Sequence, residues 1–260
     1  MSINIAVAGK GGSGKTSLTG LIIRYLIRQG LGPVLAVDAD PNANLGDSLG
    51  LTTRQTVGSI IASFNEEKIN IPAGLTKEAY LELKLHDAMV ESKGLDLVTM
   101  GRGEGAECYC YPNLLLRKFM DNLAGSYAFM VMDNEAGMEH LSRRTTQNID
   151  ELFLISDHSM KGVRTIARLR ELVTELKLTV KRQSVIINFV LGEIDPLINE
   201  ELARLNLTPA TTIPLDEAIS ECDLKVKSLL DLPDTSGAVR TVDALLTEFL
   251  KPERIQTTKT

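Results

Sequence analysis

Gly9-Lys10-Gly11-Gly12-Ser13-Gly14-Lys15-Thr16 is the stretch that decides the fold, and it fits the phosphate-loop pattern G-x-x-x-x-G-K-[ST] at every fixed position. A short apolar run over 3–8 precedes it, and apolar residues at helical spacing over 18–26 follow it. Strand, glycine-rich turn and helix together place backbone N–H groups and a helix N-terminus around phosphate. The stretch therefore predicts a nucleotide-binding loop, with Lys15 on the β- and γ-phosphates and the Thr16 hydroxyl on Mg²⁺.

Apolar strand-like runs alternate with helical patterns along the rest of the chain. Buried strands are predicted over 3–8, 34–37, 95–100, 128–132, 152–155 and 184–190, with a seventh over 210–213. Helices are predicted over 18–26, 76–90, 113–123, 163–176 and 239–249. This alternation predicts a doubly wound α/β fold, in which a mostly parallel sheet of about seven strands carries helices on both faces. We expect a single P-loop domain over 1–250 and a polar, frayed tail over 251–260.

Composition narrows the class of protein. The chain has 260 residues, of which 43% are apolar and 24% charged, so it can bury a core. A net charge of −6 disfavours a nucleic-acid partner, and no apolar stretch is long enough to span a membrane. Three cysteines cannot form a disulfide framework, which favours a reducing compartment. We therefore expect a cytoplasmic protein that binds neither nucleic acid nor membrane.

Acidic residues follow two of the predicted strands. Asp38 and Asp40 stand in Asp38-Ala39-Asp40-Pro41-Asn42, which is also compatible with a simple turn because Asp-Pro favours one. Four apolar residues over 129–132 end in Asp133, the pattern of a Walker B strand whose acid touches Mg²⁺ or its water. Because strand ends in such sheets face the ligand crevice, we expect Asp133 beside magnesium. Asp38 is expected to support either the magnesium site or the fold. The alternative for Asp133 is a carboxylate at a strand end that has no role in metal binding.

A Cys-x-Cys pair follows the third predicted strand. In an extended backbone the thiols of Cys108 and Cys110 face the same side, and a disulfide at this spacing would be strained. Two thiolates fall short of the four ligands of a tetrahedral soft-metal site, so a second copy of the pair across a two-fold axis is the economical completion. The pair thus indicates a homodimer that binds a soft metal ion, and thiolates take nickel and zinc alike, although two buried structural thiols are an alternative. Cys222 is expected to be a core thiol.

The second lysine of the phosphate loop carries a resemblance. With Lys10, the loop resembles the deviant Walker A motif K-G-G-x-G-K-[ST] of the MinD, ParA, ArsA and nitrogenase iron-protein group. The resemblance implies that Lys10 reaches the nucleotide of a partner subunit and that Asp40 orients or deprotonates the attacking water. It also implies that a Gly137 amide bonds the γ-phosphate, that Asn188 recognises adenine, and that Pro214-Leu215-Asp216 lines the base pocket. For the last two segments, an ordinary turn after a strand is the alternative.

A closer resemblance covers residues 3–250. The segments G-R-G-E-G-A-E-C-Y-C-Y-P-N-x-L-L-R over 101–117 and D-N-E-A-G-M-E-H-L-S-R over 133–143 look like those of CooC-type ATPases. These are nickel-insertion accessory proteins of carbon monoxide dehydrogenase, with relatives that serve acetyl-CoA synthase. The resemblance implies an ATP-hydrolysing homodimer, slow without its partner, that binds metal at the cysteines and helps load nickel into a client enzyme. The alternatives are a MinD/ParA-like positioning ATPase and a nucleotide switch with a purely structural metal site.

The predicted site residues fall into four groups. Catalytic roles are expected for Lys10, Lys15 and Asp40; nucleotide binding for Gly11, Gly12, Ser13, Gly14, Lys15, Thr16, Ser17, Gly137, Asn188, Pro214 and Asp216; magnesium binding for Thr16, Asp38 and Asp133; and soft-metal binding for Cys108 and Cys110.

Overall fold

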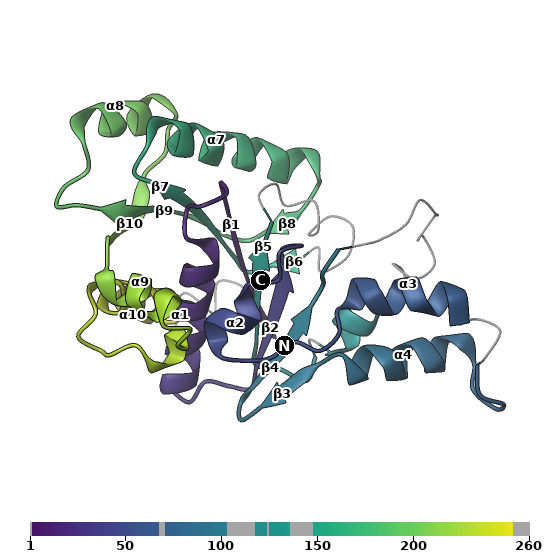
Figure 1. Cartoon of the computed structure of the whole chain (residues 1–260). Coiled ribbons are helices and arrows are strands. Elements are labelled where there is room, and N and C mark those ends of the chain that lie inside the picture. Colours follow the sequence, from purple (N-terminus) through teal and green to yellow (C-terminus); the bar gives the residue numbers. More distant parts are fainter. Residues whose placement is uncertain (1, 68–70, 103–117, 124, 136–147, 252–260) are drawn as a thin grey trace.

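The computed structural model describes residues 2–67, 71–102, 118–123, 125–135 and 148–251 (Figure 1). Its centre is an eight-stranded sheet in the order β10-β9-β7-β1-β5-β2-β4-β3. The strands are β1 Ile3–Gly9, β2 Val34–Ala39, β3 Val90–Ser92, β4 Leu95–Thr99, β5 Phe129–Asn134, β7 Glu151–Asp157, β9 Gln183–Val190 and β10 Pro209–Pro214. Two short strands, β6 Asn148–Ile149 and β8 Thr179–Val180, form a separate parallel pair.

The sheet confirms the predicted doubly wound class and corrects its strand count to eight. Six of its neighbouring pairs are parallel, and only β3 runs antiparallel, against β4. The helix predicted over 76–90 ends at Asp87, and the chain then enters β3. A turn in which Gly94 has a left-handed φ of 77° joins β3 to β4, and such a φ favours glycine.

Helices cover both faces of the sheet. They are α1 Lys15–Arg28, α2 Leu45–Leu49, α3 Val57–Glu67, α4 Lys77–Asp87, α7 Met160–Glu175, α8 Pro196–Arg204, α9 Glu217–Leu224, the 3₁₀ turn η1 Leu229–Asp231 and α10 Gly237–Phe249. The helix predicted over 113–123 is described only at 118–123, where it is helical. Helices α2, α3, α8 and α9 are additions that the sequence patterns did not reveal.

Alternate residues of each strand enter two different cores. Ile5 and Val7 pack in the core beneath α1, α9 and α10, whereas Ala6 and Ala8 pack in the core beneath α3, α4 and α7. Successive side chains of a strand point to opposite faces of the sheet, and here both faces are buried. This explains why the central strands are apolar without interruption. Figure 1 shows α1, α9 and α10 gathered on one side, with α3 and α4 projecting on the other.

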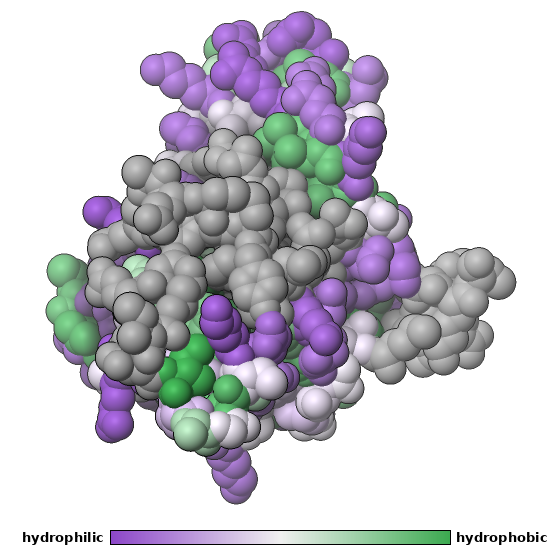
Figure 2. Space-filling model, turned by 90° about the vertical axis from the view of Figure 1, so that its right-hand side faces the viewer, coloured by the Kyte–Doolittle hydropathy of each residue, from purple (hydrophilic) through white to green (hydrophobic). Residues whose placement is uncertain are grey.

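The outer faces of the helices are mainly polar. Figure 2 views the side from which α3 and α4 project, and hydrophilic side chains dominate its upper part, where Figure 1 places α7 and α8. Among the described helices, none combines the length with the apolar character that crossing a bilayer requires.

The carboxyl ends of the parallel strands bring the functional candidates together. β1 ends in Gly9, where the phosphate loop begins, and its neighbours β5 and β7 deliver Asp133 and Asp157. β2 contributes Asp38 directly opposite Asp133, and β9 contributes Asn188. In open α/β sheets this edge is where ligands bind.

Candidate nucleotide-binding site

Glycines shape the loop between β1 and α1. A Cβ atom at Gly9 would collide with the carbonyl oxygen of Ile155, so only glycine lets the loop start this close to β7. Gly12 and Gly14 have φ values of 77° and 89°, which turn the chain into α1. Added Cβ atoms at Gly11 and Gly12 would meet no described atom within 4 Å. The space beside these two glycines is therefore open, so phosphate oxygens can approach the loop there.

The loop folds around one of its own carbonyl oxygens. The Lys10 oxygen accepts hydrogen bonds from the Ser13 backbone N–H (3.2 Å), from the Ser13 hydroxyl (2.8 Å) and from the Lys15 ammonium (3.3 Å). Lys15 is 7% exposed. Its charge is therefore already held within the loop, next to the open space above the glycines.

Thr16 and Asp133, which are predicted to bind magnesium, contact each other. The Thr16 hydroxyl donates a 2.6 Å hydrogen bond to Asp133 Oδ2. Asp133 is 1% exposed, and burial raises its pKa to about 7 despite the bond from Thr16. Its other carboxylate oxygen, Oδ1, is buried with no hydrogen-bond partner among the described residues. An unpaired buried carboxylate oxygen beside the loop threonine fits a divalent cation.

The donor set suits magnesium in particular. No three His, Cys, Asp or Glu side chains gather into a self-sufficient metal site in the described part of the chain. Mg²⁺ needs no such cage, because it keeps several waters and takes further oxygens from the phosphates of its nucleotide. One hydroxyl and one carboxylate are therefore a sufficient protein contribution.

Asp38 shapes the segment that follows β2. Its buried carboxylate accepts hydrogen bonds from the N–H groups of Leu45 (2.9 Å) and Asp40 (3.2 Å). Burial nevertheless raises its pKa to about 6. These bonds give Asp38 a role in the loop backbone, and its contact with magnesium stays a prediction.

Asp40 lies at the rim of the site. Its Oδ1 accepts hydrogen bonds from the backbone N–H (2.9 Å) and the side-chain amide (3.0 Å) of Asn42. No described residue bonds its second oxygen, and the side chain is partly exposed. That oxygen can accept a proton or a hydrogen bond from water, so the catalytic role of Asp40 stays a prediction with suitable geometry.

Asn188 braces the phosphate loop. Its side-chain nitrogen donates a 2.9 Å hydrogen bond to the Ser13 carbonyl, and its oxygen accepts one of the same length from Phe189 N–H. Phe189 has a positive φ of 61°, rare for a bulky residue, and its ring lies against Gly14. Sequence reasoning missed this bracing, and adenine recognition by the remaining N–H hydrogen and lone pair of Asn188 stays a prediction.

Asp216 joins two helices. Its Oδ1 accepts from Ala218 N–H (2.9 Å) at the start of α9, and its Oδ2 accepts from the Ser236 hydroxyl (2.6 Å) and Ala238 N–H (3.0 Å) at the start of α10. Burial alone would raise its pKa, but the bonds from Ser236 and the backbone N–H groups lower it overall. The carboxylate is thus a structural anchor two residues after Pro214, and a base-pocket role for this segment stays a prediction.

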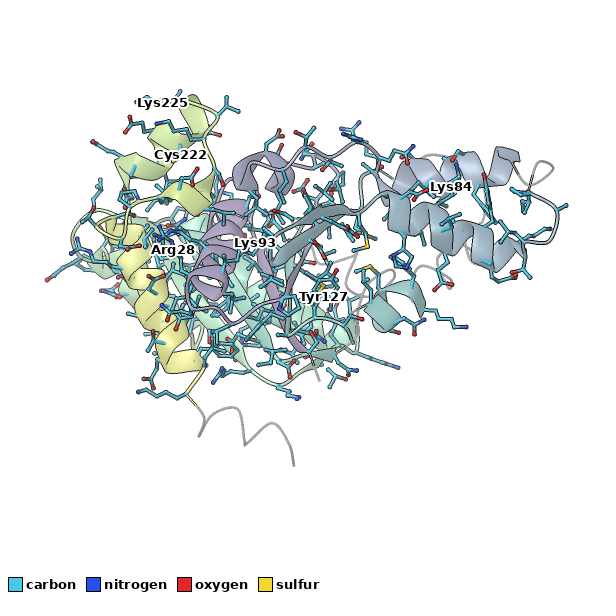
Figure 3. The ribbon with its side chains drawn as sticks, turned by 90° about the horizontal axis from the view of Figure 1, so that it is seen from below. Arg28, Lys84, Lys93, Tyr127, Cys222 and Lys225 are labelled. Atoms are coloured by element: carbon cyan, nitrogen blue, oxygen red, sulfur yellow. The ribbon has the colours of Figure 1, made fainter. Side chains whose placement is uncertain are left out.

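Three predicted site residues lie outside the described residues: Gly137, Cys108 and Cys110. The third cysteine, Cys222, is buried on α9 in the core shared with α1 and α10, which confirms the prediction of a core thiol. Figure 3 shows Cys222 on this helix, with Lys225 near the helix end.

Comparisons with known proteins agree with this geometry. A family model described as the CobQ/CobB/MinD/ParA nucleotide binding domain matches residues 5–229. The chain is 42% identical, over 95% of its length and 98% of the relative, to an uncharacterized ATP-binding protein of Methanocaldococcus jannaschii. It is 27% identical to the carbon monoxide dehydrogenase accessory protein CooC of Rhodospirillum rubrum, over 96% and 98% of the two chains.

A solved structure with the same fold contains a nucleotide. The septum site-determining protein MinD of Pyrococcus horikoshii, complexed with Mg-ADP, superimposes with a TM-score of 0.70 over 98% of this chain and 99% of that one, at 20% identity. At this identity the likeness establishes the fold, whereas the family model covers most of the sequence. The chain therefore belongs to the CobQ/CobB/MinD/ParA family of nucleotide-binding domains.

Proposed function

We propose that this protein is a cytoplasmic, homodimeric ATPase that helps insert nickel into the active-site cluster of carbon monoxide dehydrogenase or acetyl-CoA synthase. The similarity to CooC over nearly the whole of both chains carries the proposal of a client and a cargo. The contact of Thr16 with Asp133 beside the Gly9–Thr16 loop supports the hydrolytic part. The proposal treats residues 1–250 as one ATPase domain.

In this proposal, each residue of the site has a separate role in ATP hydrolysis. The loop N–H groups and Lys15 bind the β- and γ-phosphates of ATP, and Thr16 with Asp133 would hold Mg²⁺. Bound there, the cation would neutralise negative charge on the phosphate oxygens. Asp40 orients or deprotonates the attacking water through the carboxylate oxygen that no described residue bonds. Lys10 approaches the nucleotide of the second subunit and stabilises charge that develops during transfer.

Cys108 and Cys110 hold the cargo in this proposal. Two thiolates from each subunit supply four soft ligands, which suit either nickel or zinc. Because metal then binds only the dimer, and ATP favours the same dimer, each ligand should tighten the binding of the other. ATP hydrolysis would separate the subunits and release the metal toward the client.

Metal stoichiometry measured beside molar mass tests the proposal. Elemental analysis and light scattering, with and without ATP and Mg²⁺, should give one nickel or zinc ion per two chains, counted separately from magnesium. Cys108→Ser and Cys110→Ser should lose that metal but keep nucleotide binding, whereas the matched Cys222→Ser variant should keep both. A tightly bound metal on a single chain would refute the shared four-thiolate site.

Membership of a family that includes MinD and ParA favours one competing function, a positioning ATPase. Co-purification of the chain with a nickel enzyme would support the nickel-insertion ATPase. Co-sedimentation of the chain with anionic vesicles or DNA would support the positioning ATPase. A third function, a nucleotide switch with a structural metal, predicts no phosphate release from ATP under any of these conditions.

A further inference from the structure

Lys10 is held by an acidic residue of its own chain. Its ammonium nitrogen lies 3.4 Å from Asp157 Oδ2, at the end of β7. The register of β1 on β7 pairs Gly9 with Ile155, so the start of the phosphate loop lies beside the end of β7 (Figure 1). The two side chains are 39% and 28% exposed. The pair therefore sits at the rim of the nucleotide site, where a second protein chain can approach it.

The Asp157 carboxylate is fixed in place by its neighbours. The Ser159 hydroxyl donates a 2.8 Å hydrogen bond to Asp157 Oδ1. A side chain at position 162 would overlap that same oxygen, so Gly162 leaves the space the carboxylate occupies. Ser159 also caps α7 by accepting from Gly162 N–H at 3.1 Å. Because Ser159 supplies the cap, Asp157 is not needed to start the helix, and its Oδ2 is left for Lys10.

We infer that Asp157 is a latch that holds Lys10 in the single chain and must release it when the ATP-bound dimer forms. The inference rests on the proposed function, because it takes Lys10 to act on the partner's nucleotide. When the dimer forms, the Lys10 ammonium leaves the Asp157 carboxylate and contacts the more highly charged phosphates of the ATP bound to the second subunit. Each dimer that forms must break two ion pairs between Lys10 and Asp157, one in each chain, and this cost opposes association. The contacts of Lys10 with the phosphates of ATP compensate for it.

Asp157→Asn tests the latch with little change in shape. The amide oxygen of asparagine can still accept the bond from Ser159, but the negative charge facing Lys10 is gone. An exposed ion pair shifts an equilibrium by about 1.4- to 5-fold, so removing two should tighten the ATP-dependent dimer by about 2- to 30-fold. Light scattering over a protein dilution series with a slowly hydrolysed ATP analogue gives the dissociation constant. Glu221→Gln, which removes an exposed pair with Lys225, is the matched control and should change nothing.

Two further measurements make the result specific. In a Lys10→Ala background, Asp157→Asn should no longer tighten the dimer, because the double-mutant cycle removes the shared contact. In the single chain without nucleotide, acetylation of Lys10, followed by mass spectrometry, should run about 1.4- to 5-fold faster in Asp157→Asn, while exposed Lys161 is unchanged.

The outcomes separate the latch from the proposed function. If the unaltered chain dimerises with ATP but Asp157→Asn neither tightens the dimer nor speeds Lys10 acetylation, the latch is refuted and the ATPase proposal stands. If no dimer forms with ATP in any variant, the proposed dimer fails. The latch then also fails as a control of association, even where acetylation shows that the ion pair exists.

Discussion

Asp133 carries the largest electrostatic cost in the site, and replacing it by asparagine should make the nucleotide-free protein more stable at high pH. The carboxylate is buried, one of its oxygens has no partner among the described residues, and Asp38 lies beside it on the neighbouring strand β2. Asparagine is close to it in shape and can still accept the hydrogen bond from Thr16. The substitution therefore removes the buried charge while leaving the packing nearly unchanged.

The sign follows from the two pKa values. The folded-state pKa of Asp133 is about 7 against 3.8 for the ordinary residue, so between these values the folded state holds a proton that the unfolded state has lost. Stability therefore falls as pH rises through this range, by up to about 1.4 kcal/mol per pH unit, and the whole cost reaches about 4 kcal/mol above pH 7. From pH 5 to pH 8, the advantage of Asp133→Asn over the unaltered protein should grow by about 2–3 kcal/mol.

Urea unfolding followed by circular dichroism, in EDTA and without nucleotide at pH 5, 6.5 and 8, measures this growth. The same substitution at Asp223, an exposed residue of α9, is the control for removing an acidic charge outside the site. With Mg-ADP present the order should reverse, because only the unaltered protein offers the cation a carboxylate. Parallel pH profiles for Asp133→Asn and the unaltered protein in EDTA would show that this carboxylate is not destabilised by burial.

Three further variants test other parts of the site. Lys15→Ala should weaken ATP binding about 10- to 150-fold by titration calorimetry, since a charged hydrogen-bond donor is lost, and unchanged affinity would move the phosphates elsewhere. Asp40→Ala should bind ATP normally but release phosphate about 10²- to 10⁴-fold more slowly, and undiminished turnover would assign the water to another residue. Asp216→Ala should lower the free energy of unfolding by about 1–4 kcal/mol because the starts of α9 and α10 each lose one hydrogen-bond acceptor. Asp195→Ala, which uncaps α8 alone, should cost about half as much, and equal losses would contradict the double anchor.

Features that are specified by a few consecutive residues could be predicted from the sequence. The phosphate loop was one, because its glycines, lysine and threonine are fixed by spacing along the chain. The position of Asp133 was another, since four apolar residues ending in this acid place a carboxylate at the carboxyl edge of a parallel sheet, where the structure pairs it with Thr16.

Features that depend on distant contacts could not be predicted. The pair of Lys10 with Asp157 joins residues 147 positions apart, and no local pattern marks Asp157 as special. The bracing of the phosphate loop by Asn188 spans 175 positions. Strand β3 was missed for another reason: it has three residues and follows α4 closely, so the helical pattern ran on into it.

The hydrogen bond from Lys15 to the Lys10 carbonyl means that this side chain loses its rotamer entropy when the protein folds and not when nucleotide binds. A lysine loses about 1.5–2 kcal/mol of rotamer entropy when it is immobilised. Because Lys15 is already buried and bonded to the Lys10 carbonyl, that loss falls on folding, and the nucleotide meets a lysine that needs little further ordering. In the proposed site, the entropy cost of ordering Lys15 therefore lowers the stability of the nucleotide-free fold and not the affinity for nucleotide. A substitution of Lys15 that weakens nucleotide binding can consequently raise the melting temperature of the nucleotide-free protein.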